Sequence, residues 1–279
     1  MKGCECEDER MYVVSGRVRE QQKIAYRIIH TRENVVTKED NGIVRYTTTS
    51  VDPHNYLQLT YLKENTGVFR PYQFTFLYEY ANTFNKLFPN TARTVTDLQH
   101  HKLLAVYKQK FNYKESKKGV SVRLFAGTIF TNTSANGQSD FFSLSGYNDY
   151  TYDRAFFNRN DFNRHQFYEI DGAFKSYTYS PPVRTMFGVN LKAPFKTKLP
   201  IGLFADAAFS KIDQTQTNFN FDVDFGIYLP IISDVVEVYF PIVTSQRAYN
   251  PDQYKDVIRF MIDLQSIEPF GLRRRLQIF

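Results

Sequence analysis

The 279-residue sequence predicts an all-β fold, and within that class an antiparallel transmembrane β-barrel of about 12 strands, in a range of roughly 10 to 14. The first observation is an alternation of apolar and polar residues, clearest over Phe221–Leu229. Successive side chains of a strand point to opposite faces, so this alternation describes a sheet with one apolar and one polar face. The second is the aromatic content of 16%, with 26 Phe and 20 Tyr, which suits the aromatic girdles of membrane barrels. The third is that alternating segments of about nine to eleven residues match the length of a membrane-crossing strand.

The alternation also places the strands along the chain. The first half is expected to hold Met11–Arg19, Lys23–His30, Ile43–Ser50, Asn55–Leu62, Tyr72–Tyr80, Leu103–Tyr113 and Val120–Phe130. The second half is expected to hold strands beginning near Phe187, Ile201, Phe221, Val236 and Ile258. Prolines stand at the ends of these runs, where a missing N–H disturbs a sheet least. No helical segments separate the strands, so a parallel sheet is not expected.

Two segments lack the alternation. Residues 1–10 are acidic, and we expect a disordered N-terminal tail followed by a barrel over residues 11–279. Residues 131–163 are rich in Asn, Ser, Gly and Tyr, which predicts a long external loop of the barrel. A poorly ordered insertion is the alternative for this loop.

Composition narrows the function classes. The net charge is +6, but the basic residues are scattered, so no nucleic-acid partner is expected. The two cysteines, Cys4 and Cys6, are too few for a four-ligand zinc site, and no metal or other cofactor is predicted. A barrel must be exported, yet the first residues do not form a signal peptide. We therefore expect either a removed signal or, preferably, that the chain is the C-terminal piece of a longer protein.

The polar face distinguishes a barrel from a sandwich. It carries charges interspersed with Gly127, Gly188, Gly202 and Gly226, and glycines within strands permit the bends and close approaches that barrels need. The residues predicted to face the lumen are Arg123, Asp206, Asp222, Asp224, Arg259 and Asp263. These carboxylates either tune ion passage or pair with the arginines to fill the lumen, and a filled lumen is the preferred interpretation.

Several short motifs carry a resemblance. They are VRLFAG at 122–127, YTYD at 150–153, PIGLFAD at 200–206, FGIYLP at 225–230, EVYFP at 237–241 and IRF at 258–260. In this order they resemble the C-terminal outer-membrane domain of long aminopeptidase-N-like metallopeptidases of Gram-negative bacteria. The match covers roughly residues 120–270. The resemblance implies a barrel that anchors a zinc peptidase at the outer membrane.

The peptidase chemistry itself is not expected in this chain. A zinc peptidase of this kind needs H-E-x-x-H, and none of the five histidines is followed by Glu. His165, with Asp161, Glu169 and the nearby Asp171, is the single constellation that suggests a rim hydrolase, and a loop histidine without a catalytic role is preferred. His100 and His101 are expected to be surface residues. No catalytic residue is predicted.

The leading hypothesis is therefore a non-catalytic barrel in the bacterial outer membrane that anchors or displays a surface or periplasmic domain. Its expected partners are outer-membrane lipid, the barrel-assembly machinery and a covalently preceding peptidase domain. A pore or transporter for small solutes is the alternative. A rim-type hydrolase and a soluble, lipocalin-like binder are less favoured hypotheses.

Overall fold

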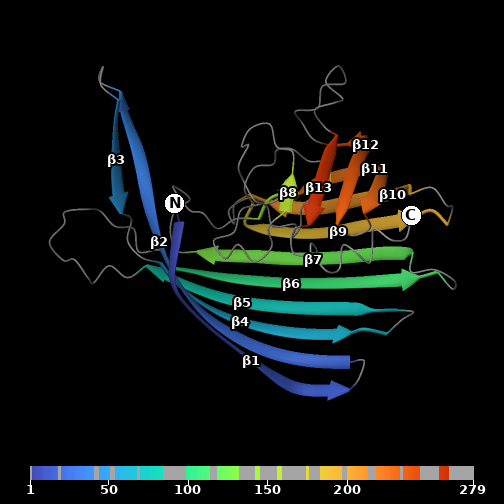
Figure 1. Ribbon diagram of the computed structural model, residues 1–279, viewed down its shortest axis with the longest axis horizontal. Helices are drawn as coiled ribbons and strands as arrows, with labels where there is room; N and C mark the ends of the chain where they lie inside the picture. The colour runs from blue at the N-terminus through green and yellow to red at the C-terminus, as the bar shows by residue number, and fades with distance from the viewer. Residues whose placement is uncertain are drawn as a thin grey trace. The chain divides into compact units, whose positions relative to one another are not determined.

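The computed structural model shows an all-β protein built on an antiparallel meander, as the alternation predicted (Figure 1). The described residues are 2–17, 20–40, 44–50, 54–67, 70–83, 99–113, 118–131, 142–144, 156–158, 174–175, 183–196, 200–212, 218–232, 235–245 and 258–263. The hydrogen-bonded order of the strands is β1-β2-β4-β5-β6-β7-β9-β10-β11-β12-β13-β8, and β3 pairs with β2 off this path.

The strands of the first half are β1 (Lys2–Arg17), β2 (Glu20–Asp40), β3 (Val44–Ser50), β4 (His54–Asn65), β5 (Tyr72–Thr83), β6 (Gln99–Asn112) and β7 (Gly119–Thr131). Those of the second half are β8 (Phe156–Asn158), β9 (Thr185–Pro194), β10 (Gly202–Lys211), β11 (Asn220–Ile232), β12 (Val236–Thr244) and β13 (Arg259–Asp263). Every strand expected from the sequence is present. The structure adds β8 and lengthens β1 and β2.

The N-terminal residues differ from the expectation. Residues 2–10, assigned by sequence to a disordered tail, belong to β1 and pair with β2 from Lys2 opposite Glu33 to Arg10 opposite Tyr26. The physical reason is that a ladder is made by backbone groups, and acidic side chains on an outermost strand do not interfere with it. The pairing is irregular between Cys4 and Cys6.

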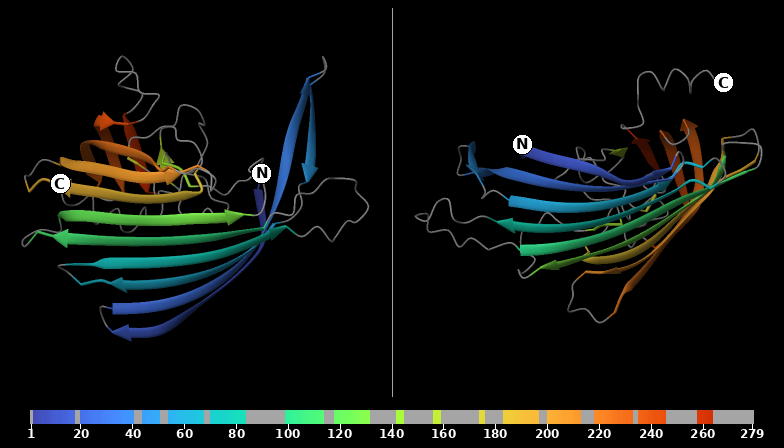
Figure 2. Two further views of the ribbon diagram at one scale, coloured as in Figure 1. Left: turned by 180° about the vertical axis from the view of Figure 1, so that it is seen from behind. Right: turned by 90° about the horizontal axis from the view of Figure 1, so that it is seen from below.

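The chain divides into two compact units. Unit 1 comprises residues 1–63, 75–104 and 129–137, and unit 2 comprises residues 64–74, 105–128 and 138–279. In unit 1 the second half of β2 pairs with β3 as a two-stranded ribbon, from Asn34 opposite Ser50 to Asp40 opposite Val44 (Figure 1). In unit 2 the direction of the strands turns progressively from β9 to β13, as Figure 2 also shows from two other sides.

The described pairings form an open path rather than a ring. Within the described residues, β1 pairs with β2 alone and β8 pairs with β13 alone. The all-β antiparallel sheet is thus confirmed, whereas closure into a barrel stays a prediction. None of the described residues belongs to a helix long and apolar enough to cross a membrane.

Burial in both units is the reverse of that in a soluble sheet. In unit 1, Leu57 and Leu59 of β4 are exposed, while Gln58 between them is buried and donates a hydrogen bond of 2.7 Å to buried Glu79. In unit 2, Phe187, Val189 and Leu191 of β9 are exposed, and the residues between them are buried. The apolar side chains of the alternation therefore face outward, and the polar ones face inward.

Candidate functional site

The candidate site is the buried face of β9–β12 in unit 2, which we call the polar face. It is formed by alternate residues of each strand: Met186, Gly188, Asn190 and Lys192 on β9, Gly202, Phe204, Asp206, Ala208 and Ser210 on β10, Asp222, Asp224, Gly226 and Tyr228 on β11, and Glu237, Tyr239 and Pro241 on β12. The opposite side, the apolar face, carries the intervening residues. Asp224, Glu237 and Tyr239 are each at most 2% exposed, so charged and hydroxyl groups are enclosed here.

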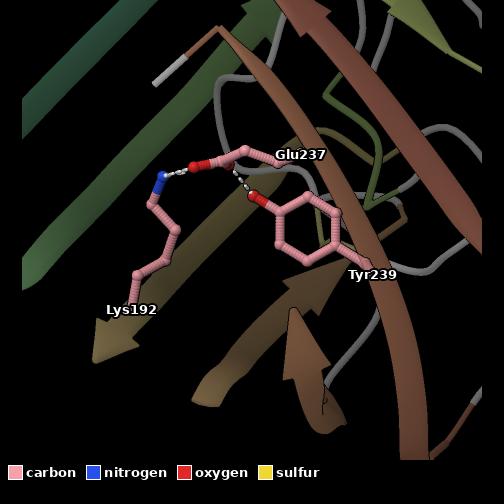
Figure 3. Close-up of polar contacts among 3 residues, drawn as sticks. All are labelled: Lys192, Glu237 and Tyr239. Carbon is pink, nitrogen blue, oxygen red and sulfur yellow. Dashed lines mark hydrogen bonds and ion pairs between the residues drawn. The ribbon is translucent and has the colours of Figure 1, made fainter. Parts of the chain in front are cut away.

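An ion pair crosses the polar face between strands that are not neighbours. Lys192 Nζ of β9 donates to both carboxylate oxygens of Glu237 on β12, at 2.9 and 3.1 Å (Figure 3). The Tyr239 hydroxyl donates a short hydrogen bond to the same carboxylate. In a flat sheet, strands three spacings apart are separated by about 14 Å. The extended Lys192 and Glu237 side chains bridge this separation and join β9 to β12 across the two strands between them.

A second polar chain runs across β7, β9 and β10. Arg123 Nη1 donates to Asn190 Oδ1 at 3.0 Å, and Asn190 Nδ2 donates to Asp206 Oδ1 at 2.8 Å. The other oxygen of Asp206 accepts the backbone N–H of Lys175 at 2.7 Å. Both oxygens of this buried carboxylate are therefore hydrogen-bonded, which offsets the cost of removing it from water.

Short pieces of chain outside the main strands lie against the polar face. We call Phe142–Leu144, Phe174–Lys175 and Val183–Arg184 the inner cluster. Backbone hydrogen bonds join its pieces, from Phe142 to Val183 in both directions and from Phe174 N to Leu144 O at 2.6 Å. Arg259 of β13 donates to the carbonyl of Phe174 at 3.3 Å. All members except Lys175 are buried, and Phe142, Phe174 and Lys175 contact inward-facing residues of the sheet.

Aromatic rings pack on glycines at inward-facing positions of β7 and β11. Phe142 meets the Phe125 ring edge-on at 5.4 Å and lies over Gly127, where an added Cβ would stand 2.6 Å from the Phe142 Cζ. Phe204 occupies the corresponding space over Gly226, at 2.7 Å. These glycines are therefore required by close approach, as the sequence predicted. Gly188 differs, because its nearest neighbours would be 3.9 Å away.

Lys175 is the exceptional charge of the site. Its Nζ lies 5.8 Å from the centre of the Tyr239 ring. Desolvation, followed by the nearby positive charges of Lys192 and Arg123, lowers the pKa of Lys175 to about 8, although Asp206 and Glu237 act in the opposite direction. A lysine in this environment carries a charge that the interior of the protein stabilises poorly.

Five of the six residues predicted to face the lumen have described side chains, and they lie on the polar face or at inward-facing positions of β7 and β13. Asp206, Asp224 and Arg259 are buried, and Arg123 and Asp222 are half-buried. Asp222 accepts a hydrogen bond of 3.1 Å from the Ser245 hydroxyl. The backbone of Asp263 lies on β13 opposite Phe156, and the structure does not describe the Asp263 side chain. The structure brings Arg123 and Asp206 together through Asn190 and places Asp222 away from that chain of contacts.

The sequence missed five polar residues of this site: Lys175, Asn190, Lys192, Glu237 and Tyr239. A signal existed for Glu237 and Lys192, because both occupy polar positions of the alternation, as Asp222 does. No such signal marked Lys175, which lies in a stretch without alternation.

The predicted histidines contribute little. His165, Asp161, Glu169 and Asp171 lie outside the described residues. His101 lies in unit 1 on β6, and its Nδ1 is 2.9 Å from the Tyr78 hydroxyl. It is exposed, as expected. No group of three or more potential metal ligands occurs among the described residues.

Comparison with known proteins adds no family to this picture. No family model matches the chain, and no curated protein matches it in sequence.

Proposed function

We propose that this chain forms a non-catalytic β-barrel of the bacterial outer membrane that anchors or displays a surface or periplasmic domain. The observation that carries the proposal is the inverted burial of the sheet: apolar side chains such as Phe187, Leu191 and Phe221 are exposed, while Asp206 and Glu237 are buried. In water this arrangement exposes a broad apolar surface at a cost of about 25 cal/mol per Å². In lipid the same surface is favourable.

The curvature of unit 2 is a second support. The strand directions turn progressively from β9 to β13 (Figure 1), and the Lys192–Glu237 ion pair joins β9 to β12 on the polar face, which would be the inner side of a closed barrel. A sheet in lipid must have no free edge, because unpaired backbone groups cost several kcal/mol each, in order of magnitude. The proposal therefore requires partners for the outer edges of β1 and β8 beyond the described pairings.

The inner cluster favours an anchor over a pore. Phe142, Phe174 and Tyr239 occupy the concave side of the sheet, where an aqueous channel would run. Purified protein in a planar bilayer is expected to give no conductance steps, whereas regular steps would favour the pore alternative.

The resemblance to metallopeptidase barrels suggests that the anchored domain is a peptidase. The genomic sequence upstream of Met1 is expected to encode, in frame, a peptidase domain with H-E-x-x-H. An upstream sequence without such a domain would remove the peptidase from the proposal and leave the barrel untouched.

The membrane location is tested by fractionation and by spin labels. We expect a sarkosyl-insoluble outer-membrane protein with heat-modifiable gel migration. In a background with Cys4 and Cys6 replaced by Ser, a nitroxide at Leu191→Cys should be reached by oxygen but not by a water-soluble nickel chelate. The matched control is Lys196→Cys, just beyond β9, where the chelate should reach the label. Chelate access at position 191, or a protein freely soluble without detergent, would contradict the proposal.

A further inference from the structure

The connections between the described strands of the meander differ in length at the two ends of the strands. Because neighbouring strands run in opposite directions, consecutive connections lie at alternating ends. One set, which defines the turn end, comprises residues 18–19, 66–71, 113–118, 195–201 and 233–235. The other set, which defines the loop end, comprises residues 41–53 with β3, 84–98, 132–184 with β8, 212–219 and 245–258. Every connection at the loop end is longer than every connection at the turn end.

Backbone hydrogen bonds close two of the connections at the turn end. Tyr113 N donates to the carbonyl of Lys118 at 2.8 Å, and Phe195 N donates to the carbonyl of Ile201 at 2.9 Å. These connections are therefore tight hairpin turns that reverse the chain directly beyond the strands. The connection of residues 132–184 differs in kind, because it contributes most of the inner cluster to the polar face.

The strands between the two ends are long enough to cross a membrane. β10 has 10 residues and is therefore about 33 Å long, and at the tilt of about 40° found in barrels it spans about 25 Å, the height of their apolar band. Aromatic side chains mark both ends, as in the girdles of such barrels. The exposed rings of Phe187 and Phe219 lie 6.1 Å apart at the loop end, and the Tyr113 hydroxyl donates to the carbonyl of Pro194 at 3.1 Å at the turn end. With the apolar face in lipid, the two ends emerge on opposite sides of the membrane.

The direction of β1 follows from its register with β2. Arg17 pairs with Glu20 across the turn of residues 18–19, and Lys2 pairs with Glu33 at the other end of the ladder. β1 therefore runs from the loop end to the turn end. A domain that precedes β1 in the chain is consequently joined to the sheet at the loop end.

We propose that the loop end faces the cell exterior and the turn end faces the periplasm, so that a domain preceding β1 is displayed at the cell surface. The difference in connection length supports this orientation, because bacterial outer-membrane barrels have short periplasmic turns and longer extracellular loops. The inference rests on the proposed membrane location. It decides between surface and periplasm, which the anchoring role alone leaves open.

The test places single cysteines at the two ends of the β9–β11 strands, with Cys4 and Cys6 replaced by Ser. Asn218→Cys is exposed directly before β11 at the loop end, and its matched variant Lys196→Cys is exposed directly after β9 at the turn end. Cells are treated with a maleimide coupled to a polyethylene glycol too large to cross the outer membrane. In intact cells we expect modification of Asn218→Cys and none of Lys196→Cys, and after permeabilisation of the outer membrane we expect modification of both.

The N-terminal side is tested directly with an epitope inserted ahead of Lys2, which an antibody should reach on intact cells. Modification of Lys196→Cys in intact cells, protection of Asn218→Cys there, or an epitope reached only after permeabilisation would each overturn the surface display. Those results leave the membrane location standing if the protein is still found in the sarkosyl-insoluble outer-membrane fraction. Absence from that fraction would overturn the membrane location and the display together. Both cysteines should react equally in denatured protein, which controls for their reactivity.

Discussion

The two faces of β9–β12 are made by alternate residues of the same strands, yet their surroundings differ. On the apolar face, Phe209 and Phe221 pack ring to ring at 4.8 Å and remain largely exposed. On the polar face, Glu237 and Asp206 are buried and fully hydrogen-bonded. Burial at these positions therefore does not follow hydrophobicity. The interior is held by paired polar groups and aromatic rings, and the apolar surface is left for an external medium to cover.

The largest expected effect comes from breaking the polar face at Glu237. Glu237→Leu leaves the Lys192 ammonium without its carboxylate and the Tyr239 hydroxyl without its acceptor, at a cost of about 3–5 kcal/mol. Denaturant unfolding in detergent measures this loss. The double variant Lys192→Met/Glu237→Leu should be less destabilised than Glu237→Leu alone. Equal stability of the single and double variants would show that the ion pair does not organise this face.

The apolar face is tested by placing a charge at its centre. If this face lies in lipid, Leu191→Lys should destabilise the protein folded in vesicles by about 2–4 kcal/mol. If the face lies in water, an exposed substitution changes stability by no more than about 0.5 kcal/mol. The control Lys196→Leu, outside the strand, should have little effect in either medium.

A smaller effect tests the packing of the inner cluster on the sheet. Gly127→Ala should cost about 1–3 kcal/mol, because the new methyl group would overlap the Phe142 ring. Gly188→Ala is the matched control on the same face, where the added methyl meets only ordinary contacts. Thermal unfolding of both variants makes the comparison. Equal destabilisation would mean that Phe142 does not occupy its position over Gly127.

The smallest effect is the pH dependence contributed by Lys175. Its pKa falls from 10.5 in the unfolded chain to about 8 in the folded protein, so the unfolded state binds more protons between these values. Stability from this group therefore rises with pH across that window. Lys175→Met should be more stable than the parent by about 1–2 kcal/mol below pH 8 in chloride buffers, and the difference should vanish by about pH 10.5. A difference that is constant with pH would contradict the lowered pKa.

The alternation in the sequence predicted much of the fold. It located the cores of β4–β7 and β9–β12, because a period of two is imposed on any strand whose faces meet different surroundings. It also placed Asp206, Asp224 and Arg259 on the polar face before any contact was known. Residues 2–10 escaped this reasoning, since their pairing with β2 is a backbone property that the acidic side chains do not reveal.

The contacts of the site could not be predicted in the same way. Periodicity assigns Lys192 and Glu237 to one face, but their meeting depends on the curvature of strands that lie between them. Lys175 belongs to no strand, and its place beside Asp206 results from chain that carries no periodic signal. Local pattern therefore determines which residues face inward, and tertiary structure decides which of them touch.

The position of Phe174–Lys175 in the chain has a consequence for the order of folding. The two residues precede β9, yet they are held by Asp206, 31 residues later, and by Arg259, 85 residues later. Contacts that close such long loops form slowly, because the entropy of the loop is lost before the contact forms. As the chain emerges from N- to C-terminus, Phe174 must wait until β13 has been synthesised. The Phe174 contact can therefore form only after β13, the last described strand, has been synthesised, so the interior is completed late in folding.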